Sequence, residues 1–194
     1  MTPEREEKFK KVIAKKQKGL TIILENVHDP HNISAVLRSC DAVGVNEVYV
    51  VYSEPALQKS LGKRSSGSAN KWLDVHYFFE LEPCIDTVKK KYGKILATHL
   101  ADDNPTSLYD VDFTENTALL FGNEKDGVSK KALDLSDGNF IIPQHGLIQS
   151  LNISVACAVS LYEVQRQRGL KGMYTSPTFS DLEQEQILNN WKER

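Results

Sequence analysis

Residues 20–44, LTIILENVHDPHNISAVLRSCDAVG, contain a short apolar run followed by a longer segment in which apolar residues recur every three or four positions. The run at 20–25 predicts a buried strand. The second pattern places its apolar side chains on one face and predicts a helix over residues 32–43. A further apolar run, EVYVVY at 47–52, predicts another strand. The stretch therefore predicts a strand–helix–strand unit.

The same alternation continues toward the C-terminus. Further strands are predicted at residues 73–78, 94–100, 117–122 and 139–143. Further helices are predicted near residues 81–91, 129–135 and 150–168, with a terminal amphipathic helix within residues 180–194. Strands that alternate with helices form a mostly parallel sheet covered by helices on both faces. The predicted fold class is therefore α/β.

Composition excludes several classes of protein. The 194 residues include three cysteines, Cys40, Cys84 and Cys157, without a CxxC pair, so neither a disulfide framework nor a zinc knuckle is predicted. The N-terminus is charged where a signal peptide would be apolar. Proline, glycine and amide side chains interrupt the uncharged interval 139–162, which leaves no apolar run long enough to span a bilayer. We expect a cytoplasmic protein without a membrane segment.

Charge is distributed unevenly along the chain, although the formal net charge is only −2. Residues 4–18 carry seven lysines and arginines against three glutamates. Such a run is commonly a solvated helix face, and it also suits an arm that contacts the phosphates of a polyanion; both interpretations stay open at this point. Other basic residues would matter only if folding gathers them on one face: Lys63, Arg64, Arg166, Arg168 and Lys171.

Glycine-containing turns indicate ligand contact late in the chain. No G-x-G-x-x-G follows the first strand and no G-x-x-x-x-G-K-[ST] occurs, so an ordinary nucleotide site is not predicted. Two turns, at residues 122–127 and 143–146, instead follow predicted strands. Ligands of open α/β sheets bind at the carboxyl ends of strands, so these turns are candidate walls of a site. The backbone freedom of glycine would also explain either turn alone.

Polar residues stand at the start of two predicted helices. Asn32 is a candidate N-cap of the first, and Ser150 and Asn152 precede the apolar body of the helix near 150–168. Arg38 lies off the apolar stripe, and its long side chain can lean back toward Asn32, because helical side chains point toward the N-terminus. Capped helices with a surface arginine, or helix ends over a cleft, are both compatible with this spacing.

The turn VHDPH offers His28, Asp29 and His31 as possible metal ligands. Zinc would need a further ligand and supporting contacts, and the chain has no second His/Cys cluster. Beside Pro30, a role in the turn itself is the expected one. A metal-dependent hydrolase built on these three residues remains an alternative, and a chelator would inhibit it.

Three stretches resemble a known family. LENVHDPHNISAVLRSCDAVG, LLFGNEKDGVS and IPQHGLIQSLNISVACAVSLYE are similar, in order and spacing, to the three motifs of the SpoU family of RNA ribose 2′-O-methyltransferases. Within this family the chain most resembles the branch that methylates guanosine 18 of tRNA. The resemblance implies a methyltransferase domain at 20–168, a basic helical arm at 1–19 and a C-terminal extension with a terminal helix at 169–194.

The resemblance also implies a deep trefoil knot in the C-terminal part of the domain, although true knots are exceptions in protein topology. It implies a homodimer, S-adenosylmethionine bound in the knot, tRNA as a partner, and no metal. The residues that match the family's catalytic positions are Arg38, Asn32, Glu124, Ser150 and Asn152. The implied walls of the cofactor site include Thr98, Gly122, Ile142 and Leu151.

These residue types suit methyl transfer to a ribose hydroxyl, which needs a polarised oxygen held in line with the methyl group. An arginine normally stays protonated, so Arg38 acts as a base only if substrate binding and desolvation remove its proton. Otherwise it stabilises the oxygen or clamps a phosphate, with Asn32 and Glu124 orienting the guanidinium. Alternatives are methylation of ribosomal RNA or of the tRNA wobble ribose, and a non-catalytic RNA-binding module that needs no cofactor.

Overall fold

The computed structural model describes residues 1–53, 71–100 and 106–194. Within these residues six strands form one sheet in the order β3–β2–β1–β5–β4–β6, and every pairing between them is parallel. The strands are β1 (Leu20–Glu25), β2 (Glu47–Val51), β3 (Asp74–Phe78), β4 (Lys94–Thr98), β5 (Thr117–Phe121) and β6 (Gly138–Phe140). The predicted α/β class with a parallel sheet is therefore confirmed.

The helices also lie close to their predicted positions. They are α1 (Pro3–Ile13), α2 (Pro30–Ala42), α4 (Leu81–Tyr92), α5 (Lys130–Leu135), α6 (Ile153–Leu170) and α7 (Asp181–Glu193), with a short 3-10 helix, η3 (Leu108–Asp110). The main differences are the ends: α2 begins earlier than predicted and α6 begins later. Across the described ranges, no helix combines the length and apolar character that a membrane span requires.

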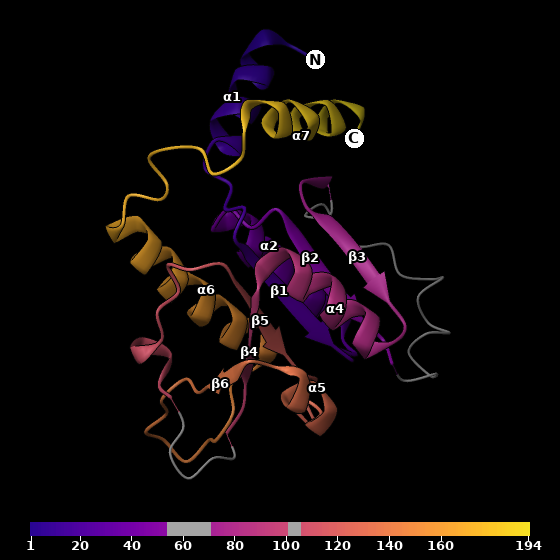
Figure 1. Ribbon diagram of the computed structural model, residues 1–194, viewed down its shortest axis with the longest axis vertical. Helices are drawn as coiled ribbons and strands as arrows, with labels where there is room; N and C mark the ends of the chain where they lie inside the picture. The colour runs from indigo at the N-terminus through magenta and orange to yellow at the C-terminus, as the bar shows by residue number, and fades with distance from the viewer. Residues whose placement is uncertain (54–70, 101–105) are drawn as a thin grey trace.

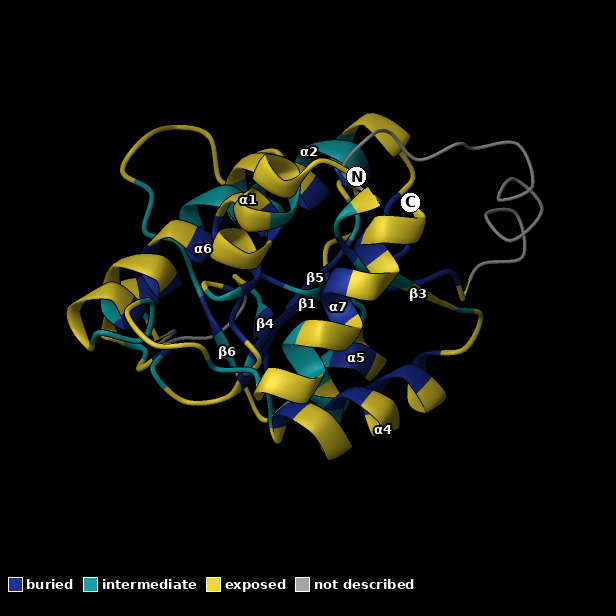
Figure 2. Cartoon of the chain, turned by 90° about the horizontal axis from the view of Figure 1, so that it is seen from above, coloured by how far each residue is buried: buried dark blue, intermediate teal, exposed yellow. Residues whose placement is uncertain are grey.

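Helices cover both faces of the sheet, as the alternation predicts (Figure 1). Side chains of α2 and α6 pack against Leu20, Ile22 and Leu24 of β1, and those of α4 and α5 pack against Ile23 on the other face. Because both faces are covered, β1 is buried along its whole length. Figure 2 shows the buried strands at the centre and the exposed outer surfaces of the helices. This double burial explains why the strand sequence is apolar rather than alternating.

The two ends of the chain pack together beyond the end of the sheet (Figure 1). Phe9 of α1, Trp191 of α7 and Trp72 before β3 form a cluster of edge-to-face rings with centroids 5.2–5.3 Å apart. Lys16 is buried beside them, where its Nζ donates to the carbonyl oxygen of Val45 at 2.9 Å. Burial lowers the pKa of Lys16 to about 8. The segment predicted as a basic arm therefore contains a helix docked on the domain.

Many basic residues of this arm have acidic partners. Lys10 contacts Glu6 at 3.0 Å along α1, and Lys18 contacts Glu183 of α7 at 2.5 Å. Lys8 is exposed and forms no ion pair with any residue that the structure describes. The solvated-face interpretation thus accounts for much of the charge run, and Lys8 remains available to an external anion.

The basic residues near the end of α6 hold the fold together. Arg168 is 1% exposed and donates hydrogen bonds of 2.8–3.0 Å to three backbone carbonyl oxygens. Arg166 binds Glu163 through two hydrogen bonds of 2.8 Å. Arg168 is therefore not part of a basic face for RNA or another polyanion, because a buried guanidinium cannot contact an external polyanion. Lys63 and Arg64 lie outside the described residues.

Candidate active site

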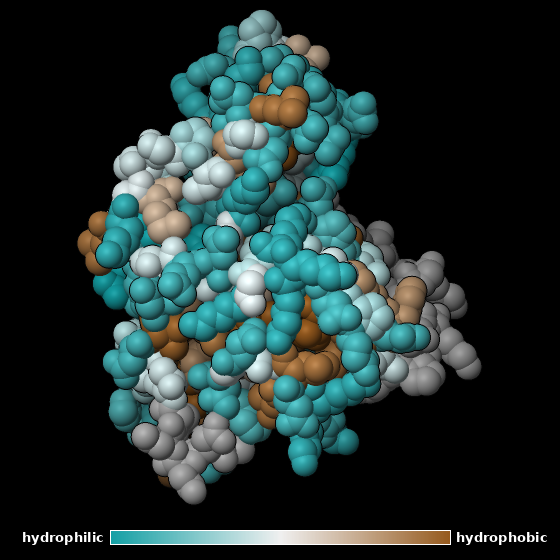
Figure 3. Space-filling view, in the orientation of Figure 1, coloured by the Kyte–Doolittle hydropathy of each residue, from teal (hydrophilic) through white to brown (hydrophobic). Residues whose placement is uncertain are grey.

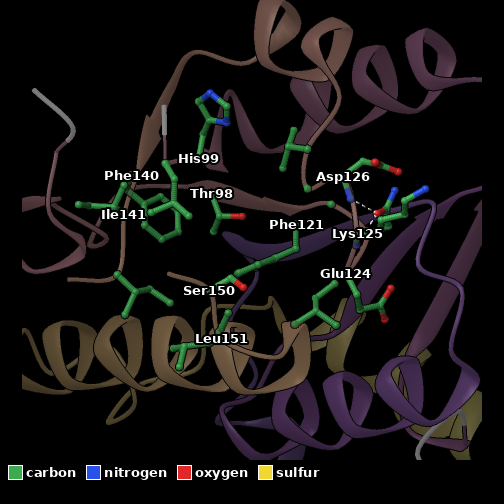
Figure 4. A pocket seen from close by; sticks show the side chains of 18 of the residues that line it. Thr98, His99, Phe121, Glu124, Lys125, Asp126, Phe140, Ile141, Ser150 and Leu151 are labelled. Atoms are coloured by element: carbon green, nitrogen blue, oxygen red, sulfur yellow. Dashed lines mark hydrogen bonds between the residues drawn. The ribbon is translucent and has the colours of Figure 1, made fainter. Parts of the chain in front are cut away.

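A cavity of about 370 Å³ lies at the carboxyl ends of β4, β5 and β6. Its walls come from the ends of these strands, from the turn at residues 122–128 and from the segment that leads into α6. Figure 4 shows Thr98, Phe121 and Ser150 converging on this space, with Glu124 at its edge. The cavity lies where the late glycine turns predict a ligand, and its volume falls in the range of small-molecule sites, roughly 300–1,000 Å³.

The four residues implied as walls of the cofactor site all line this cavity: Thr98, Gly122, Ile142 and Leu151. Thr98 ends β4, and its hydroxyl donates to the carbonyl oxygen of Leu120 at 3.4 Å. Leu151 stands two residues before α6 and is 38% exposed. Folding therefore brings together residues from three separate segments, whereas their contact with a cofactor stays a prediction.

The turn after β5 is closed by its own backbone. Asn123 and Gly127 exchange N–H···O hydrogen bonds of 3.2 and 3.1 Å. The side-chain oxygen of Asn123 also accepts from the N–H groups of Lys125 and Asp126. A Cβ on Gly122 would lie 1.9 Å from the carbonyl oxygen of Gly127, so the close approach of the backbone excludes any side chain at position 122. Packing thus explains Gly122, and the positive φ of 69° explains Gly127, without reference to a ligand.

Three polar residues from three parts of the chain form one hydrogen-bonded line beside the cavity. Asn32 Nδ2 donates to Glu124 Oε1 at 2.5 Å, and Asn152 Nδ2 donates to Asn32 Oδ1 at 3.2 Å. Because a carboxylate only accepts, Glu124 fixes the orientation of the Asn32 amide, which in turn fixes that of Asn152. We call Glu124, Asn32 and Asn152 the polar line. It connects the cavity turn to the first turn of α2 and to the start of α6.

The two asparagines differ in their capping roles. Asn152 is the N-cap of α6, where its Oδ1 accepts from the N–H of Ser154 at 2.9 Å. The predicted N-cap role of Asn32 is wrong, because α2 begins two residues before it at Pro30. Asp29 is the N-cap instead, and proline suits the first helical position because its missing N–H has no helical partner there. Asn32 is therefore a first-turn residue whose side chain is used in the polar line.

The turn before α2 is used for helix capping. The carboxylate of Asp29 accepts from the N–H of His31 at 2.8 Å, an interaction that stabilises the start of the helix. Within the ranges that the structure describes, no group of three His, Cys, Asp or Glu side chains is arranged to hold a metal ion. The geometry therefore does not support a hydrolase built on His28, Asp29 and His31.

Arg38 lies on the exposed side of α2 and does not line the cavity. It forms no hydrogen bond or ion pair with the residues that the structure describes, and Asn32 and Glu124 bind each other instead of the guanidinium. Six residues rotate a helix by about 600°, so the two side chains project from different sides of α2. The predicted contact of Arg38 with these two residues is absent, and its guanidinium is free to bind a group from outside.

Lys125 and Asp126 of the predicted turn line the cavity, and so do two residues that the sequence did not single out, His99 and Phe140. Their proximity depends on the strand order, which the sequence pattern does not contain. A buried glutamate, Glu25, was also missed. The sequence does contain a signal for Glu25, because it is a charged residue at the end of an otherwise apolar strand.

The sequence of this chain is similar to known proteins over nearly its whole length. The profile of the SpoU rRNA methylase family matches residues 19–162. Over 190 residues the chain is 41% identical to the tRNA (guanosine(18)-2′-O)-methyltransferase of Thermus thermophilus, and the match covers 98% of this chain and 96% of that protein. The sequence similarity thus extends over α1 and α7 as well as the sheet.

Solved structures show the same relationship. The crystal structure of the A. aeolicus TrmH/SpoU tRNA modifying enzyme is similar with a TM-score of 0.86 and 34% identity, over 98% of this chain and 95% of that one. The SpoU methyltransferase AviRb from Streptomyces viridochromogenes, solved in complex with the cofactor AdoMet, is similar with a TM-score of 0.65 and 27% identity. That match covers 81% of this chain and 64% of AviRb.

Proposed function

Because the chain belongs to the SpoU methylase family, we propose that it transfers a methyl group from S-adenosylmethionine to the 2′-hydroxyl of guanosine 18 in tRNA. The observation that carries this proposal is that the three motif segments meet beside one cavity: the second and third motifs line it, and Asn32 of the first is hydrogen-bonded to Glu124 and Asn152. The full-length similarity to a tRNA (guanosine(18)-2′-O)-methyltransferase supports tRNA as the substrate.

The cavity suits the cofactor in size and in the character of its walls. Ile142 and Leu151 offer apolar surface to an adenine ring, and the hydroxyl of Thr98 and the backbone at Gly122 offer polar groups. These four residues would hold S-adenosylmethionine, which when bound supplies a methyl group on a positively charged sulfur. Ser150 also lines the cavity, and we assign its hydroxyl to the side that receives the ribose.

Arg38 would act on the RNA. A guanidinium stays protonated at neutral pH, and its fork of N–H donors matches a phosphate or a developing alkoxide. The lack of an internal partner among the described residues supports this role, because a bound RNA group would not have to displace one. The polar line fixes the position of α2 relative to the cavity turn. Arg38 would therefore be delivered on a rigid helix.

We also propose a homodimer with α6 at its interface. Large apolar side chains on and before this helix are exposed in the single chain: Leu147, Ile148, Val155 and Tyr162. Large apolar side chains that gather on a surface are typical of protein interfaces. Sedimentation velocity should show a dimer, and the Tyr162→Lys variant should sediment as a monomer; a monomeric wild-type protein would contradict the proposal.

The proposed knot involves the link between β4 and β5. Gln167 of α6 donates to the carbonyl oxygen of Val111 and accepts from the N–H of Phe113, each at 2.9 Å, so α6 is attached to that link. We propose that the segment between β6 and α6 passes through the link and forms a deep trefoil knot around the cavity. A crystal structure in which this segment runs outside the link would contradict the knot.

Residues 1–19 and 169–194 are proposed as flanking elements that together contact RNA. Their helices α1 and α7 pack on each other through Phe9 and Trp191. Figure 3 shows a mainly hydrophilic surface over these two helices. The domain at 20–168 would carry the chemistry, and the two flanking helices would extend the RNA-binding surface.

Methyl transfer from tritiated S-adenosylmethionine to unmodified tRNA transcripts tests the function. We expect label in tRNA, and none when guanosine 18 carries a 2′-deoxyribose. Label at the wobble ribose or only in ribosomal RNA would identify a different substrate within the family. Isothermal titration separates the remaining alternative, because a non-catalytic RNA-binding module would not bind S-adenosylmethionine.

A further inference from the structure

A buried carboxylate at the end of β1 holds the residue that follows the cavity turn. Glu25 is 2% exposed. Its Oε2 accepts from the N–H of Ser129 at 2.9 Å, and its Oε1 accepts from the hydroxyl of Ser129 at 2.6 Å. The same hydroxyl oxygen accepts from the N–H of Ala132 at 3.1 Å and caps α5. Both oxygens of one side chain are thus committed to a single residue.

This contact attaches both ends of the turn to neighbouring residues of one strand. Before the turn, Phe121 of β5 is paired with Leu24 of β1. After the turn, Ser129 is bound to Glu25, the next residue of β1. The turn between them presents Glu124 to Asn32. The position of Glu124 relative to α2 therefore depends on two adjacent residues of β1.

A carboxylate suits this place because it accepts two hydrogen bonds at once. A buried charge is costly unless hydrogen bonds compensate for lost water, and the backbone and side-chain donors of Ser129 provide two of them. Within the described ranges no basic side chain pairs with Glu25, so the two bonds to Ser129 are its main compensation. If Ser129 moved away, the buried carboxylate would lack hydrogen-bond donors, which costs free energy. The contact between Glu25 and Ser129 is therefore rigid.

We propose that Glu25 is a positioning residue for methyl transfer. It holds the turn at residues 122–128 against β1, so that Glu124 meets Asn32 and the cavity keeps its shape. Glu25 acts through Ser129 and does not line the cavity. The role in methyl transfer rests on the proposed function, whereas the mechanical role of the contact does not.

Hydrogen exchange of the wild-type protein and its variants tests the mechanical role. Glu25→Ala and Ser129→Ala should speed exchange in the peptide that covers residues 122–129 by about tenfold, because the turn loses an anchor. Two matched controls should leave this peptide unchanged. Ser136→Ala removes a serine hydrogen bond at the other end of α5, and Thr21→Val removes a buried hydroxyl from the same strand.

Cofactor titration and turnover test the functional role. Glu25→Ala should weaken S-adenosylmethionine binding about tenfold and lower kcat about 100-fold, since a small misplacement of reacting groups is enough for such a loss. Glu25→Gln should recover most of both values, because its amide oxygen can accept from the N–H of Ser129 while its NH₂ donates to the hydroxyl. If Glu25→Ala does not fold, Ser129→Ala replaces it, because the backbone bond to Glu25 remains.

The outcomes separate this inference from the proposed function. Equal exchange and equal affinity in Glu25→Ala, Ser129→Ala and the two controls would overturn the assignment of Glu25. A wild-type protein that neither binds S-adenosylmethionine nor methylates RNA would instead overturn the proposed function, and the role in methyl transfer with it. The inference is supported if Glu25→Ala and Ser129→Ala show faster exchange of the turn and weaker binding of S-adenosylmethionine, and the two control variants show neither.

Discussion

Two glutamates lie at opposite ends of the sheet in different surroundings. Glu47 begins β2, is buried, and accepts from the hydroxyls of Tyr49 and Tyr92. His76 and Lys91 contact the same carboxylate at 3.1 and 2.6 Å. Four side chains from β2, β3 and α4 are therefore gathered on one buried group.

At the carboxyl end, Glu124 is exposed on a turn and binds an amide that leads to the start of α6. The polar line is reached by solvent, and the cavity opens beside it. Each carboxylate organises several segments. The cluster at Glu47 is closed by its protein partners, whereas the polar line retains accessible polar groups that a ligand can use.

The partners of Glu47 also keep it ionised. Burial alone would raise the pKa of Glu47, but the hydrogen bonds from His76, Lys91 and Tyr92 outweigh it and lower the pKa from the usual 4.5 to about 2. A carboxylate held this firmly in its ionised form stabilises the fold. The amino end of the sheet therefore carries a stabilising cluster, and the carboxyl end carries the cavity at which we propose the chemistry.

Arg38→Ala should produce the largest effect, at the carboxyl end. We expect methyl transfer to fall by about 10²–10³-fold, because the charged donor that we propose to stabilise the transition state is removed. The Kd for S-adenosylmethionine should stay near the wild-type value, since Arg38 lies outside the cavity lining. Lys90→Ala removes an exposed cation from α4, on the other face of the sheet, and serves as the control. Unchanged turnover in Arg38→Ala would remove Arg38 from the mechanism.

Asn152→Asp separates the two roles of this residue. Aspartate caps helices as well as asparagine does, so the melting temperature should stay within about 2 °C of the wild type. The variant loses the N–H that Asn152 donates to Asn32, and the Asn32 amide cannot turn over without presenting its oxygen to Glu124. Methyl transfer should therefore fall about 100-fold.

Asn152→Ala is the companion variant, because it removes the cap as well and should also cost about 1 kcal/mol of unfolding free energy. If both Asn152 variants lost activity only in proportion to their loss of stability, capping alone would explain the residue. The polar line would then resemble the cluster at Glu47 in being purely structural.

Glu47→Gln should affect stability without affecting chemistry. We expect a loss on the order of 2 kcal/mol of unfolding free energy at pH 7, measured by urea denaturation, because a hydrogen-bonded buried charge is removed. The folded-state pKa lies below the unfolded one, so the contribution is full above about pH 4.5 and is lost as the pH falls toward 2. The variant should therefore show a flatter stability profile over that window. A changed Kd for S-adenosylmethionine in this variant would show that the amino end of the sheet also affects the cofactor site.

The smallest effect is expected on the flanking helices. Lys8→Ala should weaken tRNA binding about threefold and reduce the slope of log K against log salt by about 1, as the loss of one phosphate contact does. Lys10→Ala removes a lysine that is already paired with Glu6 and should change the slope less. Equal salt slopes for the wild type and both variants would exclude α1 from the RNA-binding surface.

Periodicity in the sequence is enough to predict the main elements of the fold. The run at 20–25 matches β1, and the cap at Asn152 is a local property of its own helix. The family resemblance also implies a role for Glu124 and for Thr98, which the structure places at the cavity. These features depend on neighbours within one or two helical turns, or on matches to known motifs, and so are readable from the chain itself.

Only the tertiary structure decided which distant segments meet. It placed β5 between β1 and β4, which brings Ser129 to Glu25 and Glu124 to Asn32 across about a hundred positions of sequence. It also buried Arg168 at the end of α6 and left Arg38 of α2 exposed. Local periodicity specifies which face of an element is apolar. The partner of that face depends on the packing of the whole chain, which no short window of sequence contains.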